Sequence, residues 1–250
     1  MAPEWHGATL PSAQEPRGGT VRNARFAVVF LMATLSSTAT AQSVAPGFSS
    51  LPKNATIALM PADIELYSIS AGGVPEPKAD WTEAAQKNFK AALDRKKSSL
   101  GVTLIDVPEA ALDELTELNA LHTAVARAIV LHHLGPAHLP TKEGKMDWSL
   151  GEAAGAARKA TGADYALYTW IRDGYATAER MAAMAAVAVL TLGRAVPGGG
   201  QQSAYASLVD LRTGQVVWFN RIQRASGDLR EADRAEETLD ALLAKFPGAK

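Results

Sequence analysis

The stretch SLVDLRTGQVVWFN, residues 207–220, decides the fold class of this 250-residue chain. Two short apolar runs flank a turn at Gly214 and predict a β-hairpin, because glycine supplies the positive φ that short hairpin loops require. The second run is apolar at every position from 216 to 219, so both faces of this strand are expected to be buried. Alternate side chains are expected to share a face, Val216 with Trp218 and Val217 with Phe219. A strand of this kind is typical of a sheet covered by helices on both sides.

Hydrophobic periodicity predicts the elements that lead to this hairpin. Strands are expected at 56–60, 102–107 and 163–171, and helices near 80–97, 109–133, 150–160, 176–192 and 229–246. Pro61 ends the first strand, and the glycines and prolines of SAGGVPEPKA, residues 70–79, predict an irregular loop. Strands that alternate with helices predict an α/β fold: a mixed sheet of about five strands flanked by helices, ending in a β-hairpin and a C-terminal helix.

The N-terminal region is typical of a secretory signal peptide. Arg22 and Arg25 precede an apolar run at 26–35, and small residues follow up to Ala41, where cleavage is expected. The apolar run is too short to span a bilayer, so no membrane span is expected after its removal. This pattern predicts a periplasmic or secreted protein. Its organisation would be an N-terminal extension with a cleaved signal peptide at 1–41, an extended leader at 42–54 and a single α/β domain at 55–250.

Composition excludes several classes of function. The 25 Lys and Arg residues are dispersed and balanced by 26 Asp and Glu residues, so no nucleic-acid partner is expected. The chain has no cysteine, which excludes disulfides and a cysteine-linked lipid anchor. No phosphate loop, dinucleotide fingerprint or serine-nucleophile elbow is present, so no cofactor is expected. His122, His132, His133 and His138 lack the i, i+4 spacing that converges on one metal ion, and structural roles are expected for them.

Two short motifs resemble a superfamily of bacterial envelope proteins. That superfamily includes the curli secretion channel subunit, the amino-terminal domain of TolB and lipoprotein activators of penicillin-binding proteins. Its "gAD" strand is matched by Ala163 and Asp164, and its "lvD…TG.vvW" hairpin by residues 209–218. The resemblance implies an envelope-associated α/β domain without enzymatic activity. The missing lipid-attachment cysteine departs from the lipoprotein members. The helix expected at 176–192 departs from the alternating strands of a membrane barrel, so no pore is expected.

Two sets of residues are candidates for function. Carboxylates Asp63, Asp106 and Asp173 follow apolar strands, where open α/β sheets place ligands, although Asp also caps and turns chains at such positions. The Ala- and Met-rich helix at 178–193 offers small residues for close approach and adaptable Met contacts. As an interface it would use Met181, Ala182, Met184, Ala185, Ala186 and Val189. Alternatively, this helix covers one face of the sheet.

These observations favour a periplasmic or secreted interaction or scaffold protein of the envelope, without enzymatic activity. Its partner would be an envelope protein or a second copy of the chain. The alternative is a periplasmic hydrolase or small-ligand binder that uses the three carboxylates at the carboxyl ends of the strands.

Overall fold

A computed structural model describes residues 39–194, 199–225 and 227–248. Residues 1–38 of the expected N-terminal extension and signal peptide lie outside these ranges, whereas its last three residues, 39–41, lie in the first strand. The helices and strands, in chain order, are β1 (Ala39–Val44), β2 (Thr56–Leu59), β3 (Asp63–Ile69), β4 (Pro75–Pro77), α1 (Ala79–Lys96), β5 (Thr103–Asp106), α2 (Thr116–His132), α3 (Ala154–Thr161), β6 (Tyr165–Ala176), α4 (Ala178–Leu190), β7 (Gly200–Asp210), β8 (Val216–Arg224) and α5 (Ala232–Leu242).

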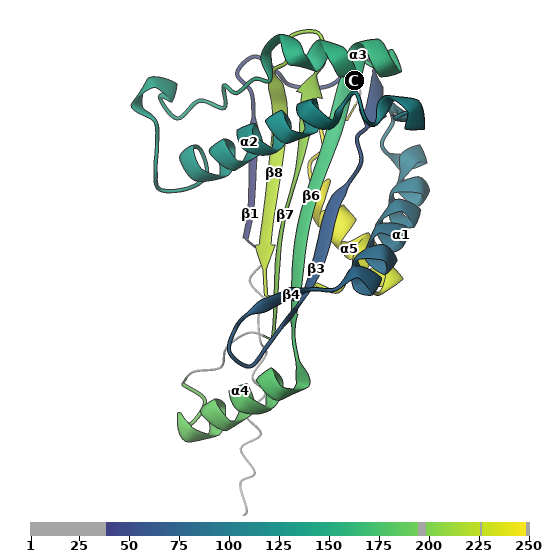
Figure 1. Cartoon of the computed structure of the whole chain (residues 1–250). Coiled ribbons are helices and arrows are strands. Elements are labelled where there is room, and N and C mark those ends of the chain that lie inside the picture. Colours follow the sequence, from purple (N-terminus) through teal and green to yellow (C-terminus); the bar gives the residue numbers. More distant parts are fainter. Residues whose placement is uncertain (1–38, 195–198, 226, 249–250) are drawn as a thin grey trace, which may run out of the picture. The chain divides into compact units, whose positions relative to one another are not determined.

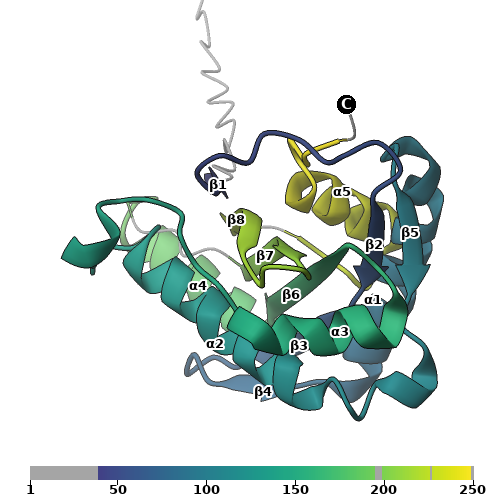
Figure 2. The ribbon, with the colours of Figure 1, turned by 90° about the horizontal axis from the view of Figure 1, so that it is seen from above.

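The fold is α/β, with a mixed sheet flanked by helices and a C-terminal helix after the hairpin, as the sequence predicts (Figure 1). The strand order is β1-β8-β7-β6-β2-β5, and β3 pairs with the second half of β6 and with β4. Strand β2 lies between β5 and β6 and is parallel to both, whereas each neighbouring pair among β6, β7, β8 and β1 is antiparallel. Helices α1 and α5 pack on one face of the sheet, and α2 and α3 pack on the other (Figure 2).

The sheet has eight strands instead of about five. Strand β3 alternates half-buried and buried side chains, the period-two pattern of a strand with one covered face. Strand β4, PEP, lies in the segment expected to be irregular, and its two prolines suit an edge strand because they donate no hydrogen bond. Much of the expected leader, 42–54, belongs to the domain, because β1 pairs with β8 and Leu51 is buried.

The hairpin strand β8 is buried on both faces, but its side chains are sorted differently from the prediction. Val216 and Phe219 join the core on the α2 side, whereas Val217 and Trp218 join the core on the α1 side. The cause is a register shift: Leu208 pairs with Trp218 and Val209 pairs with Val216, so Val217 is left over as a bulge. A bulge reverses the alternation of side chains at one point of a strand.

Candidate functional site

The sheet is interrupted beside β6, where β2 ends and β3 begins. Leu59 of β2 pairs with Leu167, and Asp63 of β3 pairs with Trp170. Residues 60–62 therefore oppose only two residues of β6, and Pro61 among them has no N–H to donate. A cavity lies on each face of the sheet at this break, and both cavities are lined by Pro61, Ala62 and Thr169.

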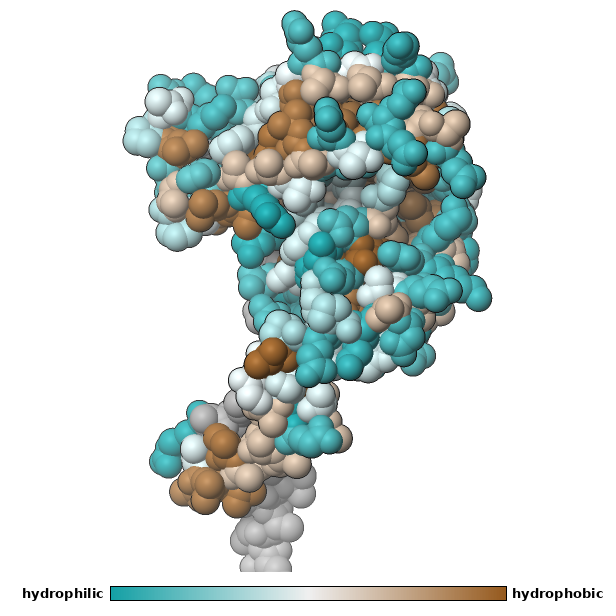
Figure 3. Space-filling view, viewed as in Figure 1, coloured by the Kyte–Doolittle hydropathy of each residue, from teal (hydrophilic) through white to brown (hydrophobic). Residues whose placement is uncertain are grey.

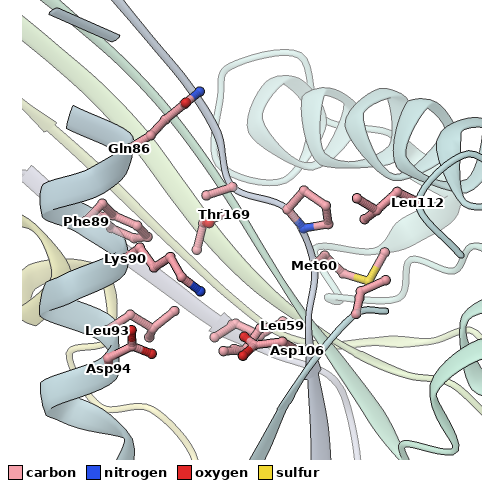
Figure 4. Close-up of a pocket in the computed structure, with 14 residues that line it drawn as sticks. Leu59, Met60, Gln86, Phe89, Lys90, Leu93, Asp94, Asp106, Leu112 and Thr169 are labelled. Atoms are coloured by element: carbon pink, nitrogen blue, oxygen red, sulfur yellow. The ribbon is translucent and has the colours of Figure 1, made fainter. Parts of the chain in front are cut away.

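The α1-side cavity has a volume of about 490 Å³ and lies between α1 and the ends of β2 and β5 (Figure 4). Most of its wall is apolar, and its polar lining residues are Gln86, Lys90, Asp94, Asp106 and Thr169. Lys97 binds both rim carboxylates, at 2.8 Å from Asp94 and 3.5 Å from Asp106. A hydrogen bond from the Lys97 ammonium lowers the pKa of Asp94, and the same contact raises the pKa of Lys97. This ion-pair cluster ties the end of α1 to the end of β5.

The α2-side cavity has a volume of about 290 Å³ and aromatic walls. The buried His122 ring stacks on Tyr168 with 3.8 Å between ring centroids, and His122 Nε2 lies 2.6 Å from Ser207 Oγ. Burial lowers the pKa of His122 to about 3, so this imidazole is neutral at physiological pH. Ser207 is fully buried and does not line the cavity, so the pair is a structural contact within the core.

Two further histidines of the described residues also contact other parts of the chain. His132 Nδ1 lies 2.6 Å from the carbonyl oxygen of Ala137, and His133 Nε2 lies 2.9 Å from Ser43 Oγ. Within the part of the chain that the structure describes, no group of three His, Cys, Asp or Glu side chains could hold a metal ion.

The three carboxylates predicted at strand ends occupy separate surroundings. Asp106 is the last residue of β5 and lines the α1-side cavity. Asp63 is the first residue of β3, lines the α2-side cavity and lies 2.7 Å from Arg172. Asp173 lies inside β6, which continues to Ala176, and is almost fully buried. The structure therefore does not bring these side chains together at one edge of the sheet.

Asp173 belongs to a buried polar network that the sequence analysis missed. It accepts hydrogen bonds from the Tyr175 hydroxyl, from Gln202 Nε2 at 2.9 Å and from the Leu229 N–H at 3.4 Å. Gln202 Oε1 accepts in turn from Arg224 Nε at 2.7 Å. Burial raises the pKa of Asp173, and these hydrogen bonds partly oppose that effect. The network joins β6, β7 and β8 beneath α5, and polar residues in otherwise apolar strands were its only signal in the sequence.

Helix α4 forms as predicted but covers neither face of the sheet, because none of its residues is buried. Its first turn is anchored: the Thr177 hydroxyl accepts from the Arg180 N–H at 3.3 Å, and Arg180 Nη1 donates to the carbonyl oxygen of Ser70 at 3.2 Å. The rest of α4 and the residues after it expose large apolar side chains (Figure 3). Val189 is 75% exposed, and Leu190 and Leu192 are each 82% exposed.

The residues predicted to form an interface lie in this exposed helix. Met181, Ala182, Ala185, Ala186 and Val189 are exposed, and Met184 is half-buried. Among the described residues, no helix combines the length and the apolar character that crossing a membrane requires.

No protein-family model and no curated protein matches this chain. Two solved structures of the PelC dodecamer from Paraburkholderia phytofirmans are similar to it. One has 13% identity over 85% of this chain and 99% of its own, with a TM-score of 0.37. The other has 15% identity over 86% of this chain and 100% of its own, also with a TM-score of 0.37. A similarity this low carries no argument about the fold, assembly or function of this chain.

Proposed function

We propose that this chain is an exported, envelope-associated interaction protein without enzymatic activity, and that it associates through α4. One observation carries this proposal: residues 181–192 contain no charged side chain, yet no residue of α4 is buried. A helix that is apolar around its whole circumference is normally covered by other protein. The described residues leave α4 without that cover, so the covering surface is expected to come from a partner.

The dimensions of α4 favour a protein partner over a lipid surface. Its 13 residues span about 20 Å, whereas the hydrocarbon core of a bilayer is about 30 Å thick. A helix that lies in a membrane interface keeps a strongly polar face towards water. The charged residues of α4, Glu179 and Arg180, are confined to its first turn, so the rest of the helix has no such face.

We take the partner to be a second copy of the chain. The exposed side chains of Ala182, Ala185 and Ala186 are small enough to let another helix approach closely. Met181 and Met184 supply side chains that adapt to an irregular surface. A two-fold contact needs only one self-complementary patch, and two α4 helices packed together would cover these residues on both copies.

Export is supported by the signal-peptide pattern, in which Arg22 and Arg25 precede the apolar run at 26–35 and small residues up to Ala41. The expected cleavage after Ala41 falls inside β1. The mature chain would keep Gln42, Ser43 and Val44, which pair with residues 218–220 of β8. Processing would therefore shorten β1 and leave half of its pairing with the sheet in place.

The test is the variant Ala182→Glu with Ala186→Glu, studied by sedimentation velocity over a range of concentrations. Both positions are exposed, so the variant is expected to keep the circular dichroism and melting temperature of the wild type. The wild type should associate as its concentration rises, and the variant should remain monomeric because charges at the contact would be desolvated. Ala91→Glu with Ala156→Glu adds the same charges at exposed positions of α1 and α3 and should associate like the wild type.

A monomeric wild type at high concentration would contradict self-association, as would unchanged association of the α4 variant. If the monomeric wild type bound phospholipid vesicles and the α4 variant did not, α4 would be assigned to a lipid surface and the proposal abandoned.

A further inference from the structure

The connections that leave β2 and β5 run to opposite faces of the sheet. Strand β2 lies between β5 and β6 and is parallel to both. After β2 the chain passes through β3, β4 and α1 to reach β5, and α1 packs on one face. After β5 it passes through α2 and α3, on the other face, to reach β6. Neighbouring strands whose connections diverge in this way open a crevice at their carboxyl ends, where open α/β sheets bind ligands.

The α1-side cavity lies at this point of divergence. Its wall includes Leu59, the last residue of β2, and Asp106, the last residue of β5. Its volume of about 490 Å³ falls within the range of small-molecule sites, as does its mainly apolar lining. Leu59 supplies the sheet side of the wall, and Phe89 and Leu93 supply the helix side (Figure 4). Leu167 of β6 also lines the cavity.

Three polar side chains of the cavity wall, Gln86, Lys90 and Thr169, make no hydrogen bond or ion pair with any described residue. Gln86 is exposed and extends away from the other two (Figure 4). The Thr169 hydroxyl makes no hydrogen bond to any residue in the described ranges, although Thr169 is only 8% exposed. Lys90 is an exposed residue that extends from α1 into the space between the helix and the strands (Figure 4). Its charge helps to lower the pKa of Asp94, but no carboxylate of the described residues lies within 4.0 Å of its ammonium. The nearby carboxylates Asp94 and Asp106 are both bound by Lys97. With Gln86 extending away, the groups left for a ligand beside the apolar wall are the Lys90 ammonium and the Thr169 hydroxyl.

We propose that the α1-side cavity binds a small amphipathic carboxylate, with its apolar body against Leu59, Phe89 and Leu167 and its carboxylate at Lys90 and Thr169. An ammonium and a hydroxyl can both donate to carboxylate oxygens, and the apolar wall favours a hydrocarbon body over a polar one. The site is independent of α4. This ligand class differs from the ligands that the three predicted carboxylates would bind, namely a metal ion or the substrate of a hydrolase.

The test uses decanoate and decan-1-ol as probes, measured by calorimetry on the folded chain below the micellar concentration of decanoate. The wild type should bind decanoate more tightly than decan-1-ol. Lys90→Met should weaken decanoate binding about fivefold, the contribution of one partly exposed ion pair, and leave decan-1-ol binding unchanged. Lys87→Met, the same change at an exposed position of α1 outside the cavity wall, should leave both affinities unchanged.

Three results would overturn the proposal. The first is a wild type that does not bind decanoate, and the second is an equal loss of affinity in Lys87→Met and Lys90→Met. The third concerns α4, the other exposed apolar surface. If Ala182→Glu with Ala186→Glu abolished decanoate binding, the probe would be bound by α4 and not by the cavity. An unchanged decanoate affinity in that variant supports the cavity, whether or not the variant self-associates.

Discussion

Replacing His122 by Gln is expected to remove one contribution to the acid sensitivity of this domain. His122 is 4% exposed, is stacked on Tyr168 and is in contact with Ser207 Oγ. Burial lowers its pKa from 6.5 to about 3. The unfolded chain therefore takes up a proton at this side chain at a pH where the folded chain does not. The free energy of unfolding falls as the pH drops below 6.5 and continues to fall until the folded-state pKa is reached.

The magnitude follows from the separation of the two pKa values. Between about pH 8 and about pH 5, the unfolded imidazole passes from almost fully neutral to almost fully protonated, while the folded imidazole stays neutral. With about 1.4 kcal/mol for each pH unit below the unfolded pKa, the loss at about pH 5 is about 2 kcal/mol. This figure is set by the unfolded-state pKa, so any folded-state pKa near 3 gives the same loss.

The assay is urea unfolding of the wild type and of His122→Gln at these two pH values. The wild type should lose about 2 kcal/mol more than the variant between them. Asp173, whose pKa is raised by burial, acts with the opposite sign, because its protonation favours the folded state as the pH falls through the raised value. That contribution is present in both proteins and cancels in the comparison. His138→Gln, at an exposed position, should keep most of the wild-type loss, because the charge of His138 is only the smaller cause of the lowered pKa of His133, after burial. Equal losses in His122→Gln and the wild type would refute a buried neutral His122.

Two further predictions concern the hairpin turn and the N-terminus. Gly214→Ala should lose about 1–3 kcal/mol more stability than Gly47→Ala in urea unfolding. Both glycines have positive φ, 74° and 80°, but only at Gly214 would an added Cβ lie 2.2 Å from a backbone oxygen, that of Gly151; equal losses would contradict this close approach. Mass spectrometry of the exported protein should find a chain that begins at Gln42, and an exported species that retains residues 26–35 would contradict the signal peptide.

Most of the helices and the hairpin could be predicted from the sequence, because their signals lie within a few residues of one another. The turn at Gly214 and the apolar run at 216–219 predict β8 and its burial on both faces, and both are confirmed. Strand β3 is different. Its period-two pattern follows Pro61 directly, and its strand conformation depends on pairing with β6, about a hundred residues later in the chain. The bulge at Val217 likewise depends on the partner strand, because a bulge exists only relative to a register.

For the candidate functional residues, too, the sequence predicts which residues and elements are involved, whereas the tertiary structure decides their surroundings. The sequence places three carboxylates near apolar strands, but only strand pairing decides their surroundings. Asp106 lines the α1-side cavity, Asp63 lines the α2-side cavity beside Arg172, and Asp173 is buried inside β6. For α4, composition predicts a helix and an apolar surface, whereas its exposure follows from its position between the ends of β6 and β7. Local patterns determine most of the helices and the hairpin, because hydrophobic periodicity acts over a few neighbouring residues. Which surfaces remain open is decided by strand order and helix placement, which join residues far apart in the sequence.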